Sequence, residues 1–174
     1  MRHCGTAGSR PEKHDVSPNA PRDRSAATVL FSALSSVTGA PGLIQQHTIE
    51  VRVRYSETDA MGFVHHSNYL NYFEMGRTEL FRQQGGNYRN MELQGLFFVV
   101  VKLQLRFRKP ARYDDVLTLE TQITRSTPAR IEHGYRLLRG TELLTEASSV
   151  IACVDRNGEL QRIPDDLADL TSDA

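Results

Sequence analysis

The chain has 174 residues, and its 21 Lys and Arg residues balance 21 Asp and Glu residues. A balanced charge gives no general attraction for a polyanion, so neither nucleic acid nor an anionic membrane is an expected partner. No apolar run approaches the roughly 18 residues that a membrane span needs. The two cysteines, Cys4 and Cys153, show neither a disulfide framework nor a metal-ligand spacing, which favours a reduced, cytoplasmic setting.

Residues 1–45 differ in composition from the rest of the chain. They are rich in Ser, Ala, Pro and Gly and lack periodicity, which predicts a tail ahead of a single domain at residues 46–174. Two interpretations of this tail stay open: a disordered segment, or a non-native one that results from a start codon placed too far upstream. The short apolar run at residues 28–34 faintly resembles a signal peptide. Serines interrupt this run and no A-x-A site follows it, so we do not expect a cleaved targeting sequence.

The first regular pattern is a strand that begins near His47. Its apolar residues alternate with charged ones, so one face is expected to be buried: Ile49, Val51, Val53 and Tyr55. A polar turn follows the strand.

A long helix comes after this turn. Its apolar positions recur at steps of three and four residues: Tyr69, Tyr72, Phe73, Gly76, Leu80 and Phe81. Ser67 or Asn68 can cap its start, and Gly85 with Gly86 can end it. Residues 87–94 then form a polar connection with room for one helical turn.

The second half of the chain predicts strands joined by short turns, at residues 96–108, 116–125, 129–139 and 143–154, with a short one at 160–163 and a helical turn at 164–170. In the first of these, one face is expected to carry Val99, Val101, Leu103, Leu105 and Phe107. Short turns make the strands antiparallel neighbours, and only a large sheet can cover the apolar face of the helix. The predicted fold is α+β, an antiparallel β-sheet wrapped around a long central α-helix, with open edges that invite a second subunit.

Polar side chains crowd into the turn before the helix, among them Glu57, Asp59, His65 and His66. A helix N-terminus presents unpaired N–H groups and a partial positive charge, so a carboxylate beside it suits carbonyl chemistry. Asp59 could instead be an Asx-turn residue ahead of Gly62. A metal site built from the four polar residues is not expected, because adjacent histidines point in different directions and no ligand spacing supports it.

The segment from Arg54 to Tyr69, RYSETDAMGFVHHSNY, carries a family resemblance, supported by Glu74, residues 77–79 and residues 109–115. On these residues the sequence resembles hotdog-fold acyl-CoA thioesterases of the 4-hydroxybenzoyl-CoA thioesterase type. It is more similar still to the bacterial acyl-CoA thioesterases associated with the Tol–Pal system. The resemblance covers about residues 47–165, and it implies a hotdog fold, an acyl-CoA substrate, no cofactor, and a homodimer or homotetramer.

The resemblance also implies roles for individual residues. Asp59 matches the catalytic carboxylate of the family, backbone N–H groups at the helix start hold the thioester oxygen, and Tyr55 and His66 match residues of the site. The substrate is then expected to contact Gly62, Val64, His65 and Tyr69. The competing interpretations make His65 a structural or solvent-facing residue, Tyr69 a core residue, and His66 a support for the turn. His65 stands where those relatives often have an aromatic residue, and Met61 stands where a glycine is common; both departures concern the acyl-chain preference.

Thioester hydrolysis needs few catalytic groups, because a thiol of pKa about 8.5 leaves as thiolate without a strong acid to protonate it. The helix N-terminus near residues 64–66 can stabilise the oxyanion. Asp59 can act as general base for water or attack directly to form a mixed anhydride. An exposed aspartate with pKa about 3.9 is a weak base, so burial against Phe63 and the helix would have to raise the pKa of Asp59.

The expected activity is hydrolysis of a short-to-medium-chain or aromatic acyl-CoA to a carboxylic acid and free CoA. Two alternatives stay open: a hotdog enoyl-thioester hydratase or dehydratase that uses His66, and a non-catalytic acyl-CoA-binding or scaffold module. A basic strip could hold the phosphates of CoA or simply be a solvated outer face: Arg106, Arg108, Lys109 and Arg112.

Overall fold

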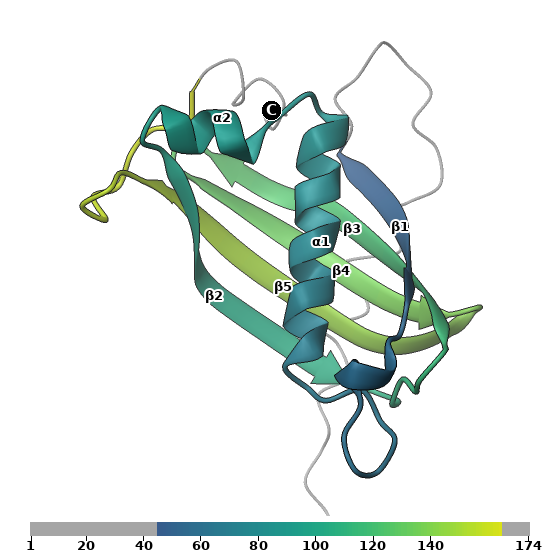
Figure 1. Cartoon of the computed structure of the whole chain (residues 1–174). Coiled ribbons are helices and arrows are strands. Elements are labelled where there is room, and N and C mark those ends of the chain that lie inside the picture. The colour runs from purple at the N-terminus through teal and green to yellow at the C-terminus, as the bar shows by residue number, and fades with distance from the viewer. Residues whose placement is uncertain (1–44, 165–174) are drawn as a thin grey trace, which may run out of the picture. The chain divides into compact units, whose positions relative to one another are not determined.

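The computed structural model describes residues 45–164, and its sheet has five antiparallel strands in the order β1-β3-β4-β5-β2. The elements in chain order are β1 (Gln46–Arg52), the 3-10 turn η1 (Tyr55–Glu57), α1 (Asn68–Gln83), α2 (Tyr88–Leu93), β2 (Phe97–Phe107), β3 (Val116–Thr127), β4 (Arg130–Arg139) and β5 (Glu142–Val154). Figure 1 shows α1 lying across one face of the curved sheet. The predicted antiparallel sheet around a long helix is confirmed.

Some predictions fall at the edges of the described chain. Apart from Gln45, the predicted tail at residues 1–45 lies outside the described residues, and so does the predicted helical turn after Pro164. The short strand predicted at 160–163 is reduced to one isolated bridge between Val154 and Leu160. Within residues 45–164, no helix combines the length and the apolar character that crossing a membrane would require.

The first strand ends earlier than its alternation predicts. Backbone pairing continues to Val53, whose N–H donates to Asp115 O at 3.0 Å, but β1 itself ends at Arg52. The Arg54 N–H then donates to a carboxylate oxygen of Glu57 at 2.8 Å, which turns the chain into η1. The expected inward position of Tyr55 is therefore wrong, because its side chain is 78% exposed.

A β-bulge changes which side chains of β2 face the helix. Val100 lies opposite the core residue Ile151, and the register shifts by one residue before Leu103 pairs with Ser149. Directly opposed residues share a face, so Val100 and Leu103 lie on the same side of the sheet and Val101 is the extra residue. Val99 lies opposite Ala152 and therefore on the other face, so the prediction that Val99 and Val101 share the face of Leu103 is corrected.

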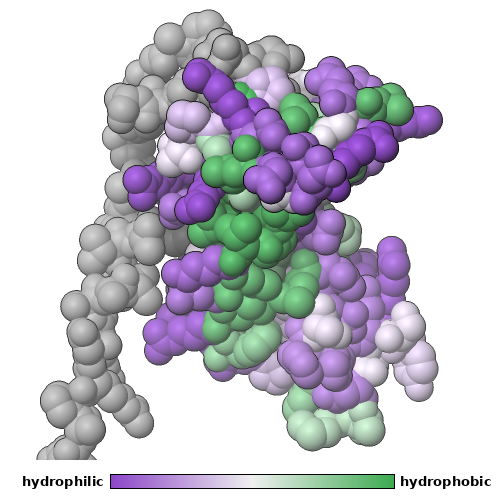
Figure 2. Space-filling model, turned by 90° about the vertical axis from the view of Figure 1, so that its left-hand side faces the viewer, coloured by the Kyte–Doolittle hydropathy of each residue, from purple (hydrophilic) through white to green (hydrophobic). Residues whose placement is uncertain are grey.

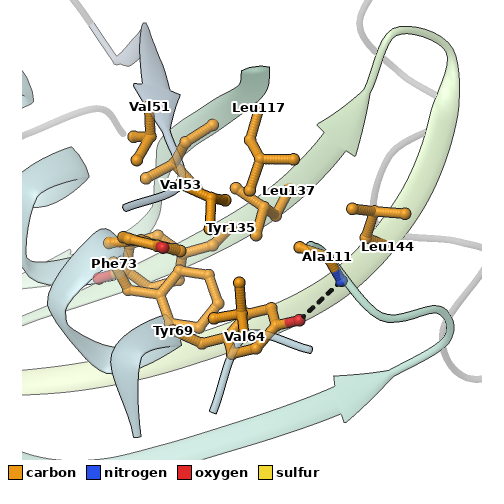
Figure 3. Packing of buried hydrophobic residues seen from close by; sticks show 12 residues of the cluster. Val51, Val53, Val64, Tyr69, Phe73, Ala111, Leu117, Tyr135, Leu137 and Leu144 are labelled. Atoms are coloured by element: carbon orange, nitrogen blue, oxygen red, sulfur yellow. Dashed lines mark hydrogen bonds between the residues drawn. The ribbon is translucent and has the colours of Figure 1, made fainter. Parts of the chain in front are cut away.

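The apolar stripe of α1 is buried as predicted: Tyr69, Tyr72, Phe73, Gly76, Leu80 and Phe81. At its centre the helix comes so close to β3 that a Cβ on Gly76 would lie 2.3 Å from Thr121 Oγ1 and 2.8 Å from Leu119 Cδ2. One apolar cluster lies under the first half of α1 and includes Val53 and Leu137 (Figure 3). The absence of a side chain at Gly76 therefore sets the distance between helix and sheet.

We expect Gly76→Ala to lower the free energy of unfolding by about 1–3 kcal/mol, because the overpacking outweighs the better helix propensity of alanine. Urea unfolding followed by circular dichroism measures the change. Met75→Ala, at an exposed neighbouring position, is the matched control and should shift stability by less than about 0.5 kcal/mol. Equal stability of Gly76→Ala and wild type would contradict the close contact.

His133 on β4 is a buried histidine, 4% exposed, and its Nδ1 has no hydrogen-bond partner among the described residues. Burial, helped by the nearby Arg77 cation, lowers the pKa of His133 to about 3. The folded pKa lies below the unfolded value of about 6.5. The stability contributed by neutral His133 is thus complete above the unfolded pKa and is lost as the pH falls toward the folded pKa.

Wild-type protein should therefore lose about 3 kcal/mol of unfolding free energy between pH 7 and pH 4 through this one group. His133→Phe keeps a planar ring in the core and removes the titration. We expect its stability to depend less steeply on pH than that of the wild type over this interval. Urea midpoints across a pH series test this expectation, and parallel profiles for the two proteins would refute it.

Candidate active site

Asp59 lies in a tight loop between η1 and α1. Its N–H donates to Phe63 O at 2.8 Å, and the Gly62 N–H donates to Asp59 O at 2.9 Å. Gly62 has φ +74°, a backbone conformation that L side chains rarely adopt, which explains the glycine here. The loop thus presents Asp59 on a closed, hydrogen-bonded turn.

The two carboxylate oxygens of Asp59 have different environments. Oδ1 accepts hydrogen bonds from the N–H groups of Met61 at 2.8 Å and Phe63 at 3.2 Å. The Asx-turn considered as an alternative is therefore present. Oδ2 accepts no hydrogen bond from any residue in the range 45–164, so the turn orients the side chain and leaves one oxygen available.

A pocket of about 410 Å³ brings Asp59 together with the start of α1 and the end of β2. Its lining residues are Asp59, Phe63, Val64, His66, Tyr69, Phe107, Arg108, Lys109 and Pro110. A larger cavity of about 730 Å³ is lined by Arg54, Glu57 and Tyr72 among others, but by neither Asp59 nor His66. The groups suited to carbonyl chemistry therefore gather in the smaller pocket.

Asp59 itself is exposed, so the predicted burial of its side chain against Phe63 and the helix is absent from the isolated chain.

The wall of this pocket is tied to the connection that follows β2. The Val64 N–H donates to Ala111 O at 2.9 Å, and the Ala111 N–H donates to the Tyr69 hydroxyl at 3.2 Å (Figure 3). The Tyr69 ring packs edge-on against Phe107, with 5.0 Å between ring centroids. Burial raises the pKa of Tyr69, so the hydroxyl keeps its proton. Tyr69 thus closes the pocket at a fixed position.

Residues 64–66, which the sequence places at the helix N-terminus, lie just before α1, and fewer of their backbone N–H groups are available than predicted. The Val64 N–H is bound to Ala111 O, and the His65 N–H donates to Glu57 O at 2.8 Å. The His66 N–H has no acceptor within the described part of the chain. Of the three N–H groups at residues 64–66, only that of His66 is available to a ligand.

The two adjacent histidines have different surroundings. His65 Nδ1 shares a hydrogen bond of 2.8 Å with the Ser67 hydroxyl, and the rings of His65 and His66 lie 4.1 Å apart. Ser67 occupies the N-cap position of α1, but its side chain makes no capping hydrogen bond.

Tyr55 packs edge-on against Tyr113, with 5.5 Å between ring centroids, and lines neither of the two pockets.

Three of the four cations of the basic strip already contact neighbouring side chains. Arg108 pairs with Glu146 at 2.6 Å, and Lys109 forms an ion pair with Glu142. The guanidinium of Arg112 lies 4.6 Å from the centre of the Phe63 ring. Two of the four cations therefore already have carboxylate partners on β5. Across residues 45–164, no group of three or more His, Cys, Asp or Glu residues could hold a metal ion.

Sequence reasoning missed the contribution of Phe107 and Pro110 to the pocket. Phe107 is the last residue of β2 and Pro110 follows it, far from the loop in sequence, and this proline was the only local signal. Their contact with the loop depends on the isolated bridge between Phe63 and Arg112. This pairing joins segments about fifty residues apart, so no local pattern reports it.

Comparison with known proteins identifies the family of this chain. Residues 53–170 match the family model described as the thioesterase-like superfamily. The chain is 41% identical over 106 residues to the acyl-CoA thioesterase YbgC of Haemophilus influenzae, which covers 60% of this chain and 78% of the relative.

Two solved structures extend the likeness to the fold. A probable thioesterase from Bartonella henselae has a TM-score of 0.66 at 35% identity, covering 68% of this chain and 99% of that one. The 4-hydroxybenzoyl CoA thioesterase from Pseudomonas sp. strain CBS-3 has a TM-score of 0.67 at 23% identity, covering 72% and 99%, and shows the shared hotdog fold. The family match covers more than half of the chain and contains the Asp59 loop, α1 and strands β2 to β5. The chain therefore belongs to the thioesterase-like superfamily.

Proposed function

We propose that this protein is an acyl-CoA thioesterase, which hydrolyses a short-to-medium-chain or aromatic acyl-CoA to a carboxylic acid and free CoA. The observation that carries the proposal is the Asp59 carboxylate. One of its oxygens is fixed by two N–H groups, and the other is unoccupied in a pocket that also contains His66. The likeness to an acyl-CoA thioesterase at 41% identity supports the choice of thioester and of CoA.

The reaction needs one oxyanion donor and one source of oxygen. In our proposal the thioester oxygen accepts the free N–H of His66, and a donor of this kind is worth roughly 10²–10³ in rate. Asp59 Oδ2 either removes a proton from water or attacks the carbonyl carbon itself. In both routes the C–S bond breaks and CoA leaves as thiolate. Water attacks either the thioester or the mixed anhydride, whose hydrolysis restores the Asp59 carboxylate, and so supplies the second oxygen of the acid. One proton of this water stays on the acid, and the other passes to the thiolate. Because Asp59 is exposed in the isolated chain, a bound acyl group would have to supply its desolvation.

The other predicted site residues take supporting roles in this proposal. Gly62 permits the turn that orients Asp59, and Val64 with Tyr69 forms the fixed wall. The His66 ring lines the pocket and is placed to contact substrate. His65 is tied to Ser67, and Tyr55 is exposed, so a direct role for Tyr55 would need a change in its contacts.

We also propose that the protein is a homodimer or homotetramer that works in the cytoplasm. The edge strand β2 leaves a row of unpaired backbone groups, and its centre is exposed: Val99 38%, Val100 48% and Val101 54%. Because α1 packs mainly against β1 and β3, it does not cover this end of the sheet. Figure 2 shows an apolar band with hydrophilic flanks on the side of the molecule that carries β2. A second copy pairing along β2 would bury this band.

Val101→Lys should convert the oligomer to monomer at micromolar concentration, because a charge on the strand edge opposes pairing. Sedimentation velocity measures the change. Leu93→Lys, at a residue that is 75% exposed outside β2, is the matched control and should keep the wild-type mass. An unchanged oligomer in Val101→Lys would argue against the β2 interface.

Asp59→Asn should lower kcat by roughly 10³-fold while the melting temperature stays within a few degrees. Asparagine keeps a side-chain oxygen for the two N–H groups of the turn, but it is neither a base nor an anionic nucleophile. Release of free thiol from a panel of acyl-CoA substrates, from acetyl to palmitoyl together with benzoyl and 4-hydroxybenzoyl, measures the effect. A folded Asp59→Asn variant with full activity would exclude the proposed chemistry.

A further inference from the structure

Two carboxylates, two residues apart, belong to different cavities. Asp59 lines the smaller pocket, whereas Glu57 lines the larger cavity together with Arg54 and Tyr72. Glu57 therefore has no position from which to contact a thioester bound beside Asp59. Its contacts suggest a different task.

Glu57 accepts four hydrogen bonds from four different residues. Its carboxylate Oε2 accepts the Arg54 N–H at 2.8 Å and the Tyr72 hydroxyl at 2.6 Å. Its backbone oxygen accepts the His65 N–H at 2.8 Å and the Asn68 side-chain amide at 2.8 Å. The residue thus joins the end of the first strand region, the residues just before α1, and the first two turns of α1.

Tyr72 provides a rigid anchor for this junction. It is 1% exposed, and its ring belongs to the apolar cluster under the first half of α1. Burial first, and then the hydrogen bond with Glu57, raises the pKa of Tyr72, so its hydroxyl remains a proton donor. A short hydrogen bond from a hydroxyl to a carboxylate is among the stronger ones in proteins. The side chain of Glu57 is consequently held by the core.

Glu57 and Asp59 are connected by one intervening residue and a few backbone hydrogen bonds. Thr58, the single residue between them, forms an antiparallel bridge with Val64, and the Asp59 N–H donates to Phe63 O at 2.8 Å. Both ends of this small closed loop are tied to Glu57, one by the peptide chain and the other through the His65 N–H. A movement of Glu57 would shift Asp59 relative to the free His66 N–H.

We propose that Glu57 is the positioning residue of the active site and that, with Tyr72, it fixes the Asp59 loop against the start of α1. The role rests on the proposed thioesterase function, in which Glu57 acts through Asp59 and never touches substrate. Catalytic groups must keep their geometry to within about 0.5 Å, and a displacement of about 1 Å can cost roughly 10²-fold in rate.

The test compares Glu57→Ala, Glu57→Gln and Tyr72→Phe. Glu57→Ala removes the side-chain acceptor and should lower kcat roughly 10–100-fold, while KM changes less than about threefold. Glu57→Gln keeps an oxygen for both donors and should restore most of the activity. Tyr72→Phe removes a single hydroxyl and should give a smaller loss. The double variant Glu57→Ala/Tyr72→Phe should be no worse than Glu57→Ala, because both changes remove the same hydrogen bond.

Glu50→Ala is the matched control, because Glu50 is an exposed carboxylate that lines the same cavity as Glu57. Its kcat should equal that of the wild type. A Glu57→Ala variant with wild-type kcat would overturn the proposal. So would an equal loss in Glu57→Ala and Glu57→Gln, since that result would assign the effect to charge rather than to position.

Amide hydrogen exchange gives a readout that does not depend on turnover. In Glu57→Ala, peptides covering residues 57–66 should exchange about tenfold faster or more, while peptides from the second half of α1 keep wild-type protection. Unchanged exchange at 57–66, or faster exchange throughout the helix and sheet, would overturn the positioning role. A wild-type protein without thioesterase activity would refute the proposed function, and hydrogen exchange alone would then decide whether Glu57 holds the loop.

Discussion

The close contact between α1 and β3 at Gly76 is the constraint on which the rest of the structure depends. The helix approaches β3 this closely because Gly76 has no side chain at the crossing point, where a Cβ would collide with the side chains of Thr121 and Leu119. The contact sets the height of α1 above the sheet. The N-terminus of the helix, two turns earlier, is then held where the loop of Asp59 can close against it.

The site itself is assembled from three segments that the fold brings together. The loop before α1 supplies Asp59 and the His66 N–H, the first turn of α1 supplies Tyr69, and the end of β2 supplies Phe107. Backbone hydrogen bonds of Val64 and Ala111 bind the loop to the connection after β2, so the pocket wall is made of main chain as well as side chains. This construction suits a reaction in which orientation contributes much of the rate.

Charge around the pocket is compensated locally. Lys109 and Arg108 form ion pairs with Glu142 and Glu146 of β5, and Arg139 also binds Glu142 at 2.6 Å. The Lys109 and Arg139 cations hold the pKa of Glu142 below its usual value. These pairs are partly exposed, so each contributes little to stability. They do reduce the positive charge that the basic strip can offer to the phosphates of CoA.

The amino-acid sequence by itself determined the elements that depend on neighbours a few residues away. The helical spacing from Tyr69 to Phe81 and the turn of Asp59 and Gly62 were both predictable, because period and turn chemistry are local. Four features became known only from the tertiary structure. They are the bulge in β2, the outward position of Tyr55, the hydrogen bonds that engage the Val64 and His65 N–H groups within the chain, and the bond between Glu57 and Tyr72. The bulge, the two N–H groups and the Glu57–Tyr72 bond depend on partners elsewhere along the chain, which no local pattern records. Tyr55 points outward because the hydrogen bond between Arg54 and Glu57 forms η1 and interrupts the alternation of the strand.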